Sequence, residues 1–298
     1  MKLLIITQAV DTQHPVLGFF HRWVEEFAKH CEHVDVIALQ TGEYHFLKNV
    51  AVHSLGKEKG AGKLKRLRTF FSLLSSLHRK YDAVFVHMNP EYLVLAGWWW
   101  RMTGKKAALW YTHKTVDVKL RIAELFANVI FTASKESFRL RSKKVRVVGH
   151  GIDTDFFSPD PRVSRSTHWL SVGRLMKSKR HDSAIREAKE AGVPLLIAGD
   201  GPERANLETL VRELGADVTF LGGLTQEKLR DEYRAAGKFI HRSETGSLDK
   251  VVLEAAACGC PVDSTDPAIA ALPLSPEYVR THHSLQALIP RIVALYTS

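Results

Sequence analysis

The sequence has few cysteines and no long apolar run. Its 298 residues include only Cys31, Cys258 and Cys260, which cannot form a disulfide framework and which favour a reducing, cytoplasmic location. Cys258 and Cys260 form an isolated C-x-C without a second pair, so we interpret them as core residues and not as metal ligands. No apolar run approaches the roughly 18 residues that a membrane-spanning helix needs. The start MKLLIITQAV lacks the features of an export signal and is expected to be a buried strand.

Several motifs of other enzyme classes are also missing. The 15 histidines are not organised as H-E-x-x-H or at zinc-finger spacing. The sequence contains no G-x-S-x-G of a serine hydrolase and no P-loop G-x-x-x-x-G-K of a nucleotide triphosphatase. These absences argue against a zinc enzyme, a hydrolase of that class and a P-loop protein.

The chain is basic. Lys and Arg number 42 against 32 Asp and Glu, which gives a net charge of +10. Such an excess favours anionic partners, whether phosphates, acidic lipids or nucleic acid. No aromatic-rich RNA-binding motif accompanies the charge, so we expect no nucleic-acid partner.

Short apolar runs alternate with amphipathic stretches, which predicts βαβ units and parallel sheets. In the first half we expect strands at 3–8, 34–39, 83–87, 107–111, 129–132 and 145–148, with helices at 19–30, 64–79 and 118–127. The second half starts the pattern again. There we expect strands at 169–172, 194–198, 218–221, 238–241 and 261–263, with helices at 181–191, 203–214, 226–236 and 251–257.

The two halves predict two Rossmann-like domains. The segment 157–167 has two prolines and no apolar periodicity, and we interpret it as a hinge. We therefore expect domains at 1–160 and 161–284, followed by a helix at 285–298 that packs back on the first domain. Open parallel sheets bind ligands beyond the carboxyl ends of their strands, so the expected site is a cleft between two facing sheets.

The chemistry-bearing residues concentrate between 169 and 263. A strand leads into Gly173, which allows a close turn, and Arg174 and Lys179 then lie where cations can meet an anion. The alternative interpretation is a pair of solvated surface charges. The next strand ends in Gly199-Asp200-Gly201-Pro202, a turn that is weak evidence by itself.

A second candidate anion site lies before the helix at 251–257. Gly246 and Ser247 precede this helix, whose free N–H groups and dipole suit a diphosphate. Glu254 lies farther along the helix, where a carboxylate can accept hydrogen bonds from ribose hydroxyls. Taken alone, Glu254 fits a helix-surface charge better.

The combination resembles the family-four group of retaining glycosyltransferases with the GT-B fold (glycosyl transferases group 1). The resemblance rests on these residues and segments in this order: Gly173-Arg174 with Lys179, the 199–202 turn, Leu253-Glu254-Ala255, Gly259, Pro261-Val262, and the segment GHGIDTDFFSP at 149–159. It is most specific over 145–262. It implies an α/β protein of the GT-B fold whose donor is a UDP- or GDP-sugar and which needs no cofactor.

The resemblance also implies roles for individual residues. Arg174 and Lys179 would contact the donor diphosphate and neutralise the charge that grows on the leaving group. His113 would position the donor sugar and stabilise the transition state without acting as a nucleophile. Asn89 and Glu91 are weaker candidates for the acceptor side. The full set of expected donor-binding residues is Gly18, Gly173, Arg174, Lys179, Gly246, Ser247, Leu248, Asp249, Lys250, Val251 and Glu254.

The sequence departs from the family pattern at two places. The first glutamate of the family's E-x7-E motif would fall on Gly246, and Glu244 is two residues too early to replace it. Asp249 and Lys250 are proposed as alternative polar contacts. The usual glycine pair after the first strand is Gly18-Phe19 here, so the phenylalanine would narrow the space near the diphosphate or the acceptor.

We expect a metal-independent, hexosyl-transferring enzyme that acts with retention on a glycan or lipid-linked acceptor. Asp153-Thr154-Asp155 spells D-x-D, but it lies inside the expected hinge and is interpreted as structural. Two alternatives stay open: a nucleotide-sugar epimerase on the same fold, and a degenerate, non-catalytic scaffold that binds a nucleotide sugar. Gly246 favours the second alternative.

Two basic segments raise the question of a membrane surface. Residues 57–71 carry six Lys or Arg before Phe70 and Phe71, with Leu64, Leu67, Phe71 and Leu74 at helical spacing. Residues 98–106 combine three tryptophans with three further cations, and three successive tryptophans cannot all face one core. One interpretation is an acidic inner membrane face bound peripherally through both segments. The other is an ordinary surface helix whose apolar stripe packs on its own sheet.

Overall fold

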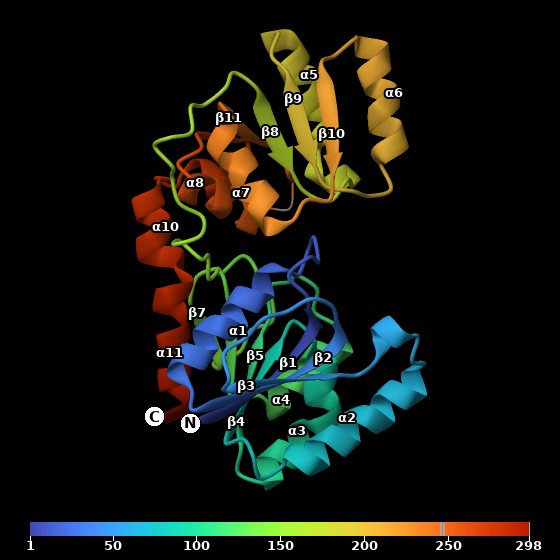
Figure 1. The fold of residues 1–298 in the computed structure, drawn as a ribbon, viewed down its shortest axis with the longest axis vertical. Helices are drawn as coiled ribbons and strands as arrows, with labels where there is room; N and C mark the ends of the chain where they lie inside the picture. The colour runs from blue at the N-terminus through green and yellow to red at the C-terminus, as the bar shows by residue number, and fades with distance from the viewer. Residues whose placement is uncertain (245, 247, 298) are drawn as a thin grey trace. The chain divides into compact units, whose positions relative to one another are not determined.

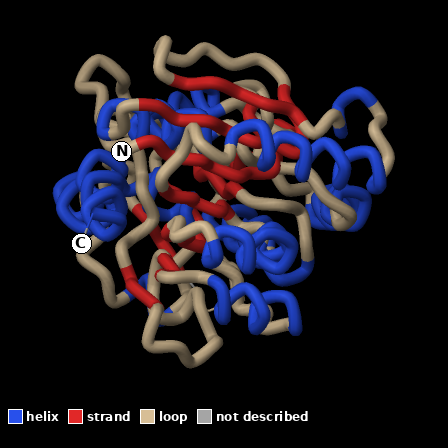
Figure 2. The backbone as a smooth tube through the Cα atoms, turned by 90° about the horizontal axis from the view of Figure 1, so that it is seen from below, coloured by secondary structure: helices blue, strands red, loops and turns tan. Residues whose placement is uncertain are grey.

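The computed structural model describes residues 1–244, 246 and 248–297. The chain divides into two compact units, the first formed by residues 1–151 together with 285–298 and the second by residues 152–284 (Figure 1). Each unit is built on a parallel sheet with helices on both faces, which confirms the α/β class predicted from the alternating pattern. Figure 2, turned by 90° from Figure 1, draws the strands in red and the helices in blue.

The first unit holds a seven-stranded parallel sheet in the order β3-β2-β1-β4-β5-β6-β7. Its strands are β1 (Lys2–Val10), β2 (His33–Thr41), β3 (Val50–Ser54), β4 (Ala83–His87), β5 (Lys106–Trp110), β6 (Val129–Thr132) and β7 (Val145–Val147). Its helices are α1 (Phe19–His30), the 3-10 turn η1 (Lys57–Lys59), α2 (Lys63–Leu77), α3 (Pro90–Met102), α4 (Val118–Phe126) and α11 (Leu285–Thr297). The strand order reverses between β1 and β4.

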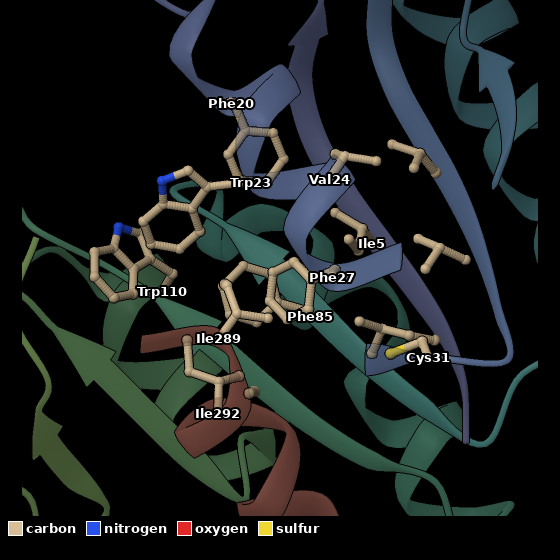
Figure 3. Packing of buried hydrophobic residues seen from close by; sticks show 14 of the residues in the cluster. Ile5, Phe20, Trp23, Val24, Phe27, Cys31, Phe85, Trp110, Ile289 and Ile292 are labelled. Carbon is tan, nitrogen blue, oxygen red and sulfur yellow. The ribbon is translucent and has the colours of Figure 1, made fainter. Parts of the chain in front are cut away.

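Side chains on β1 alternate between two cores. Leu3 and Ile5 point into a cluster covered by α1 and α11, whereas Leu4 and Ile6 point into a cluster covered by α2, α3 and α4. Figure 3 shows the first cluster, in which Trp23 and Trp110 meet edge to face with ring centroids 4.7 Å apart. The indole N–H of Trp23 donates to the carbonyl oxygen of Gly151 at 3.0 Å. This burial on both faces explains the nearly continuous apolar strands of the sequence.

The second unit holds a five-stranded parallel sheet in the order β10-β9-β8-β11-β12. Its strands are β8 (Trp169–Val172), β9 (Leu195–Ala198), β10 (Val218–Gly222), β11 (Lys238–His241) and β12 (Val262–Ser264). Its helices are η2 (Lys177–Lys179), α5 (His181–Ala191), α6 (Arg204–Leu214), α7 (Gln226–Ala235), α8 (Lys250–Ala257), α9 (Pro267–Ala270) and α10 (Pro276–His283). One face is covered by α5 and α6, and the other by α7, α8 and α10.

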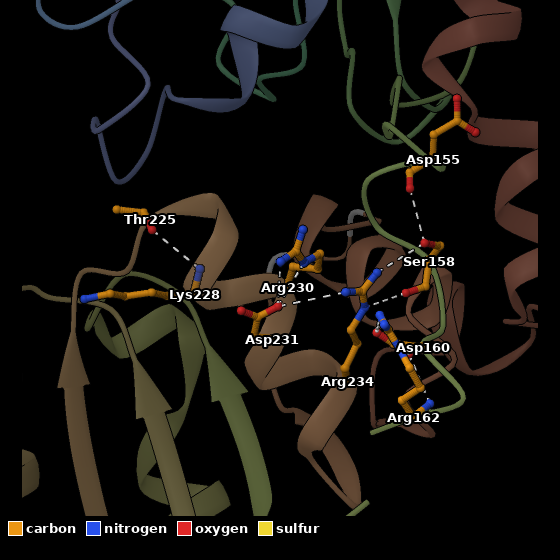
Figure 4. Close-up of polar contacts among 9 residues, drawn as sticks. All are labelled: Asp155, Ser158, Asp160, Arg162, Thr225, Lys228, Arg230, Asp231 and Arg234. Carbon is orange, nitrogen blue, oxygen red and sulfur yellow. Dashed lines mark hydrogen bonds and ion pairs between the residues drawn. The ribbon is translucent and has the colours of Figure 1, made fainter. Parts of the chain in front are cut away.

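The segment 157–167 is tied to the second unit. Arg234 on α7 donates from Nε to the carbonyl oxygen of Ser158 at 2.7 Å (Figure 4). The guanidinium of Arg165 donates to the carbonyl oxygens of Ala236 and Cys258, at 2.9 and 3.1 Å. The division between the units accordingly falls between Gly151 and Ile152, before this proline-containing segment.

Two elements of the first unit are absent from the expected pattern. The edge strand β3 has five half-buried residues, and its apolar run is only Val50-Ala51-Val52. Helix α3 begins with Pro90 at its first turn, a position that proline favours, and runs through the three tryptophans. Trp100 is fully buried and donates to the Tyr81 hydroxyl at 3.1 Å, whereas Trp98 is exposed, as three successive tryptophans on one helix require.

The apolar stripe of α2 differs from the expected one. The side chains that pack on the sheet are Phe70, Leu74 and Leu77, while Leu64 and Phe71 are exposed. Of the two interpretations of this segment, packing of the apolar stripe on its own sheet holds for Leu74 but not for Leu64 and Phe71, which the rotation of the helix turns towards solvent. No helix among the described residues has the length and apolar character required to cross a membrane.

Candidate functional site

The carboxyl edge of the second sheet gathers the glycine turns. Gly173 follows strand β8 and Gly199 follows its neighbour β9. The amide of Gly199 donates to the carbonyl oxygen of Gly222, the last residue of β10, at 2.7 Å. Gly199 has φ +137°, and a Cβ there would overlap the carbonyl oxygen of Gly173. Glycine is needed at this position because two backbone turns approach each other without room for a side chain. At Gly173 and Gly199 the two turns therefore meet through their backbones.

Arg174 follows directly after Gly173. Its side chain is exposed, and no hydrogen bond or ion pair joins its guanidinium to any residue in the described part of the chain. A guanidinium without a protein partner can donate two parallel hydrogen bonds to an anion. Arg174 is thus a cation available at the carboxyl edge, as the sequence predicts.

Lys179 is the last residue of η2, and its side chain extends to the loop that precedes helix α8. Its Nζ is 2.5 Å from Oδ2 of Asp249, the residue that precedes α8. The same carboxylate oxygen is 3.0 Å from Nε2 of His241. The structure therefore brings together two expected donor residues, Lys179 and Asp249, through a direct ion pair, and adds His241, which the sequence analysis did not single out.

The helix α8 begins at Lys250, one residue before the expected start. Gly246 is exposed with φ +59°, so it takes the left-handed conformation that favours glycine. Leu248 is buried in the core of this unit, and Val251 is half-buried. Ser247, also expected at this loop, lies outside the described residues.

Glu254 is not a helix-surface charge. Its side chain is 2% exposed, forms an ion pair with Lys250 one helical turn earlier, and accepts a hydrogen bond from Tyr233 Oη at 3.4 Å. Burial first, and then the charge of Glu254, raise the pKa of Tyr233 well above its ordinary value. The interpretation of Glu254 as a solvated charge is therefore wrong, because the packing of α8 against α7 encloses it.

Glu244 does not stand in for the glutamate missing at 246. Its carboxylate pairs with Arg180, and its amide donates to the Ser178 carbonyl at 3.0 Å. These contacts hold the loop after β11 against η2. Arg180 itself has φ +50°, an uncommon conformation for a residue with a side chain.

The first unit gathers its own candidates at the carboxyl edge of its sheet. Asn89 follows β4 as the N-cap residue of α3 and accepts at Oδ1 from Gln8 Nε2 at 2.9 Å. Met88, between β4 and Asn89, has φ +63°, a strained conformation of the kind that clusters at functional sites. Glu91 pairs with Lys119 at 3.1 Å. Gln8 and Met88 were missed by the sequence analysis because neither belongs to a motif.

His113 and Gly18 lie at the same edge. His113 is exposed on the loop after β5, with its ring centroid 6.0 Å from that of Tyr111. Gly18 precedes α1, and a Cβ there would lie 2.8 Å from the His14 carbonyl oxygen, so the turn excludes a side chain. Phe19, next to it, packs edge to face with His87 and is half-buried.

Asp153 and Asp155 form a turn. Oδ1 of Asp153 accepts from the amides of Asp155 and Phe156, both at 3.2 Å. No group of three His, Cys, Asp or Glu side chains is placed to hold a metal ion in the part of the chain that the structure describes.

Comparison with known proteins identifies the family of the second unit. Residues 155–271 match the family Glycosyl transferases group 1. This region contains Arg174, Lys179, Asp249 and Glu254. Residues 155–271 are a glycosyl transferases group 1 domain. The match confirms the resemblance inferred from the glycine turns and from Leu253-Glu254-Ala255.

Part of the chain also matches a relative with an assigned activity. The chain is 38% identical over 150 residues to D-inositol 3-phosphate glycosyltransferase of Mycolicibacterium smegmatis, which covers 44% of this chain and 34% of that protein. The alignment with the curated relatives thus spans about a third of their length.

Solved structures share the fold along the whole chain. The Anabaena protein HepE in complex with UDP and glucose superposes with a TM-score of 0.74 at 16% identity, covering 100% of this chain and 99% of that one. UDP-GlcNAc 2-epimerase of Methanocaldococcus jannaschii superposes with a TM-score of 0.58 at 10% identity, covering 100% and 99%. The chain has the GT-B fold, and because an epimerase shares it, the fold alone does not select the reaction.

Proposed function

We propose that the chain transfers a sugar from a UDP- or GDP-sugar to a hydroxyl-bearing glycan or lipid-linked acceptor, with retention of the anomeric configuration. The observation that carries the proposal is the guanidinium of Arg174, which is exposed and has no hydrogen bond or ion pair among the described residues, beside the Gly173 and Gly199 turns and inside a glycosyl transferases group 1 domain. The diphosphate of a nucleotide sugar supplies the anion that this cation lacks.

The leaving group of the reaction is the nucleoside diphosphate, which gains negative charge as the bond to the sugar breaks. The Arg174 guanidinium and the Lys179 ammonium are the cations that stabilise this charge in the proposal. Glu254, expected to hold the ribose, would do so from a buried position next to Lys250 and Tyr233. Donor residues at 246–251 would contribute mainly backbone contacts, since Leu248 is buried and Gly246 has no side chain.

The acceptor binds the first unit in this proposal. Asn89 presents a side-chain amide whose Nδ2 is buried without a hydrogen-bond partner among the described residues. Together with Gln8 and the Glu91 carboxylate it supplies the donors and acceptors that hydroxyl groups require. His113 on the next loop would position the sugar. The named activity of the mycobacterial relative, on D-inositol 3-phosphate, makes a phosphorylated polyol one acceptor to test.

Retention without a covalent intermediate is part of the proposal. The carboxylates of Asp249, Glu254 and Glu91 are each held in an ion pair, and the proposal assigns none of them an attack on the sugar. Same-face displacement, in which the departing diphosphate assists the incoming hydroxyl, then accounts for retention. We also propose that the reaction is independent of a metal ion, with Arg174 and Lys179 as the charge-neutralising groups.

Two other functions are each favoured by one observation. The structural likeness to an epimerase makes epimerisation the second candidate, which would release nucleotide without any acceptor. Gly246 in place of the family's first motif glutamate favours a non-catalytic scaffold. Nucleotide binding without release in the presence of acceptors would favour the scaffold.

We also propose that the first unit binds peripherally to the inner face of the membrane. Leu64, Phe71 and Trp98 are exposed on α2 and α3, which cover the same face of the first sheet, and Lys63, Lys65 and Arg68 are exposed on α2. Exposed apolar groups next to cations suit an anionic leaflet. Such a surface would bring a lipid-linked acceptor to the enzyme.

The donor site is tested by isothermal titration with UDP, GDP and ADP. We expect one nucleotide to bind the wild-type protein and to lose most of its affinity in Arg174→Ala. Arg186→Ala is the matched control, because Arg186 is exposed in the middle of α5 and its side chain makes no hydrogen bond or ion pair among the described residues. Equal affinity of all three proteins, or no binding at all, would contradict the proposed site.

A further inference from the structure

A chain of polar contacts leads from the end of the second sheet to the donor-site lysine. Ser264 Oγ on β12 lies 3.0 Å from Nδ1 of His241 on β11, and Nε2 of His241 lies 3.0 Å from Oδ2 of Asp249. The same oxygen of Asp249 is 2.5 Å from Nζ of Lys179. Four residues from three separate parts of the sequence are thus connected in series.

The residues connected by these contacts are largely shielded from solvent. His241 is buried, and the side chains of Asp249 and Lys179 are 17% and 22% exposed. Burial alone would raise the pKa of Asp249, but the hydrogen bond with His241 and the charge of Lys179 outweigh it and lower that pKa to about 2. Asp249 is consequently a carboxylate at neutral pH, with the imidazole on one side and the ammonium on the other.

The lysine held by Asp249 lies against Gly173. Cγ and Cδ of Lys179 would be 3.7 and 3.6 Å from a Cβ atom at Gly173, so the aliphatic stem covers the glycine. An ammonium group has three donors, and the contact with Asp249 uses one of them. Two donors stay available to the oxygens of a ligand at the carboxyl edge of β8.

We propose that Asp249, fixed by His241, is a positioning residue that sets the place of the Lys179 ammonium for the departing diphosphate. The inference rests on the proposed function, because it takes Lys179 as a ligand of that diphosphate. Lysine has a flexible four-carbon stem, so its ammonium is preorganised only when another group holds it. Arg174, whose guanidinium is held by no carboxylate in the described part of the chain, is the contrasting cation of the same site.

This role predicts opposite effects on binding and on turnover. Removing the charge in Asp249→Asn takes a carboxylate away from a site for an anion, so the affinity for the nucleoside diphosphate is retained or increases. The lysine then samples several rotamers, and kcat falls between about tenfold and about a hundredfold because the stabilising charge is no longer in place. A merely structural role would weaken binding and turnover together.

The first experiment needs no substrate. The protein is treated briefly with an amine-acetylating reagent, and the modified fractions of Lys179 and Lys177 are compared by mass spectrometry. Lys177 is exposed in the same short η2 turn and serves as the internal standard. We expect a low Lys179-to-Lys177 ratio in the wild type and a several-fold higher ratio in Asp249→Asn, because an ammonium in an ion pair reacts slowly.

Asp249→Gly is a second variant with the same expected result, since glycine is tolerated at a helix N-cap. Thermal unfolding identifies which of the two variants are folded. An unchanged ratio in the folded variant would overturn the pairing of Asp249 with Lys179. This readout does not depend on what the site binds.

The second experiment measures UDP and GDP affinity and the rate of nucleotide release for wild type, Asp249→Asn, Lys179→Ala and the double variant. We expect the kcat loss of Asp249→Asn to disappear in the Lys179→Ala background, because both changes act through the same ammonium. Additive losses would overturn the positioning role. A raised acetylation ratio in a protein that binds neither nucleotide would overturn the proposed function, and the positioning role with it, while leaving the ion pair established.

Discussion

The imidazole of His87 stacks on the ring of Phe20, with centroids 3.9 Å apart and planes 17° from parallel. Burial lowers the pKa of His87 to about 3, and burial likewise lowers the pKa of His181 and that of His283 to about 4. In the folded chain these imidazoles are therefore neutral, whereas in the unfolded chain they take up protons near pH 6.5.

The pH dependence of stability follows from this difference. The unfolded state binds more protons between pH 6.5 and the lowered values, so stability is full above pH 6.5 and is lost as the pH falls towards 4. Each such histidine contributes a slope of up to about 1.4 kcal/mol per pH unit. Urea unfolding at pH 7.5 and pH 5 tests this, and His87→Phe, which keeps the stacking, should reduce the slope. Equal stability of the wild type at both pH values would contradict the account.

The contact between the Gly199 and Gly173 turns gives a second prediction. Gly199→Ala should lower the free energy of unfolding by about 3 kcal/mol or more, because the new Cβ overlaps the Gly173 carbonyl in a backbone conformation that only glycine adopts readily. Gly192→Ala is the control: its φ is +66° and nothing lies within 4 Å of the added atom, so we expect a loss of about 1 kcal/mol. Chemical denaturation compares the two, and equal losses would show that the two turns do not approach as described.

The ion pair of Lys250 with the buried Glu254 gives a third prediction. Lys250→Ala leaves a carboxylate that is 2% exposed without its compensating charge, which should cost about 3 kcal/mol of unfolding free energy. Lys228→Ala on the exposed side of α7 should change it by less than about 0.5 kcal/mol. Urea denaturation of both variants at pH 7.5 is the measurement. If Lys250→Ala were as stable as Lys228→Ala, Glu254 would have to be solvated.

A fourth prediction concerns the basic surface of the first unit. The wild type should float with liposomes that contain acidic lipids at low salt and be released at high salt, because exposed cations contribute about 1 kcal/mol each near such a surface. Phe71→Ser with Trp98→Ser, which removes two exposed aromatic side chains, should abolish flotation, whereas Val147→Ser on β7 should not. Wild-type protein that stays in the soluble fraction at low salt would refute the membrane proposal.

The strands were the most predictable part of the fold. Each sheet is buried on both faces, so its inner strands are short apolar runs that stand out from the amphipathic helices around them. The edge strand β3 is only half-buried, and its apolar run is limited to Val50-Ala51-Val52. Helix α3 was hidden for the opposite reason: its segment from Tyr92 to Trp100 is apolar nearly all round, so it has no polar stripe to reveal the helical period.

The candidate site was predictable only where it depends on local sequence. Gly173, Arg174 and the 199–202 turn follow strands directly, and their place at the carboxyl edge follows from the parallel sheet. The partners of Lys179 and Glu254 depend on contacts between residues distant in the sequence, such as the 70 positions that separate Lys179 from Asp249. No periodicity encodes such a contact, which is why Asp249 was expected to face the donor and His241 was not singled out.

The central claim is that Arg174 belongs to a site that breaks the bond between a sugar and a nucleoside diphosphate. The most direct measurement is nucleotide release from a panel of UDP-, GDP- and ADP-sugars, with and without EDTA and with and without a polyol acceptor, for wild type, Arg174→Ala and Arg186→Ala. We predict EDTA-insensitive release from one donor, stimulated by acceptor, retained in Arg186→Ala and reduced at least about a hundredfold in Arg174→Ala. Release that is equal in the two variants, or absent from the wild type with every donor and acceptor, would contradict it.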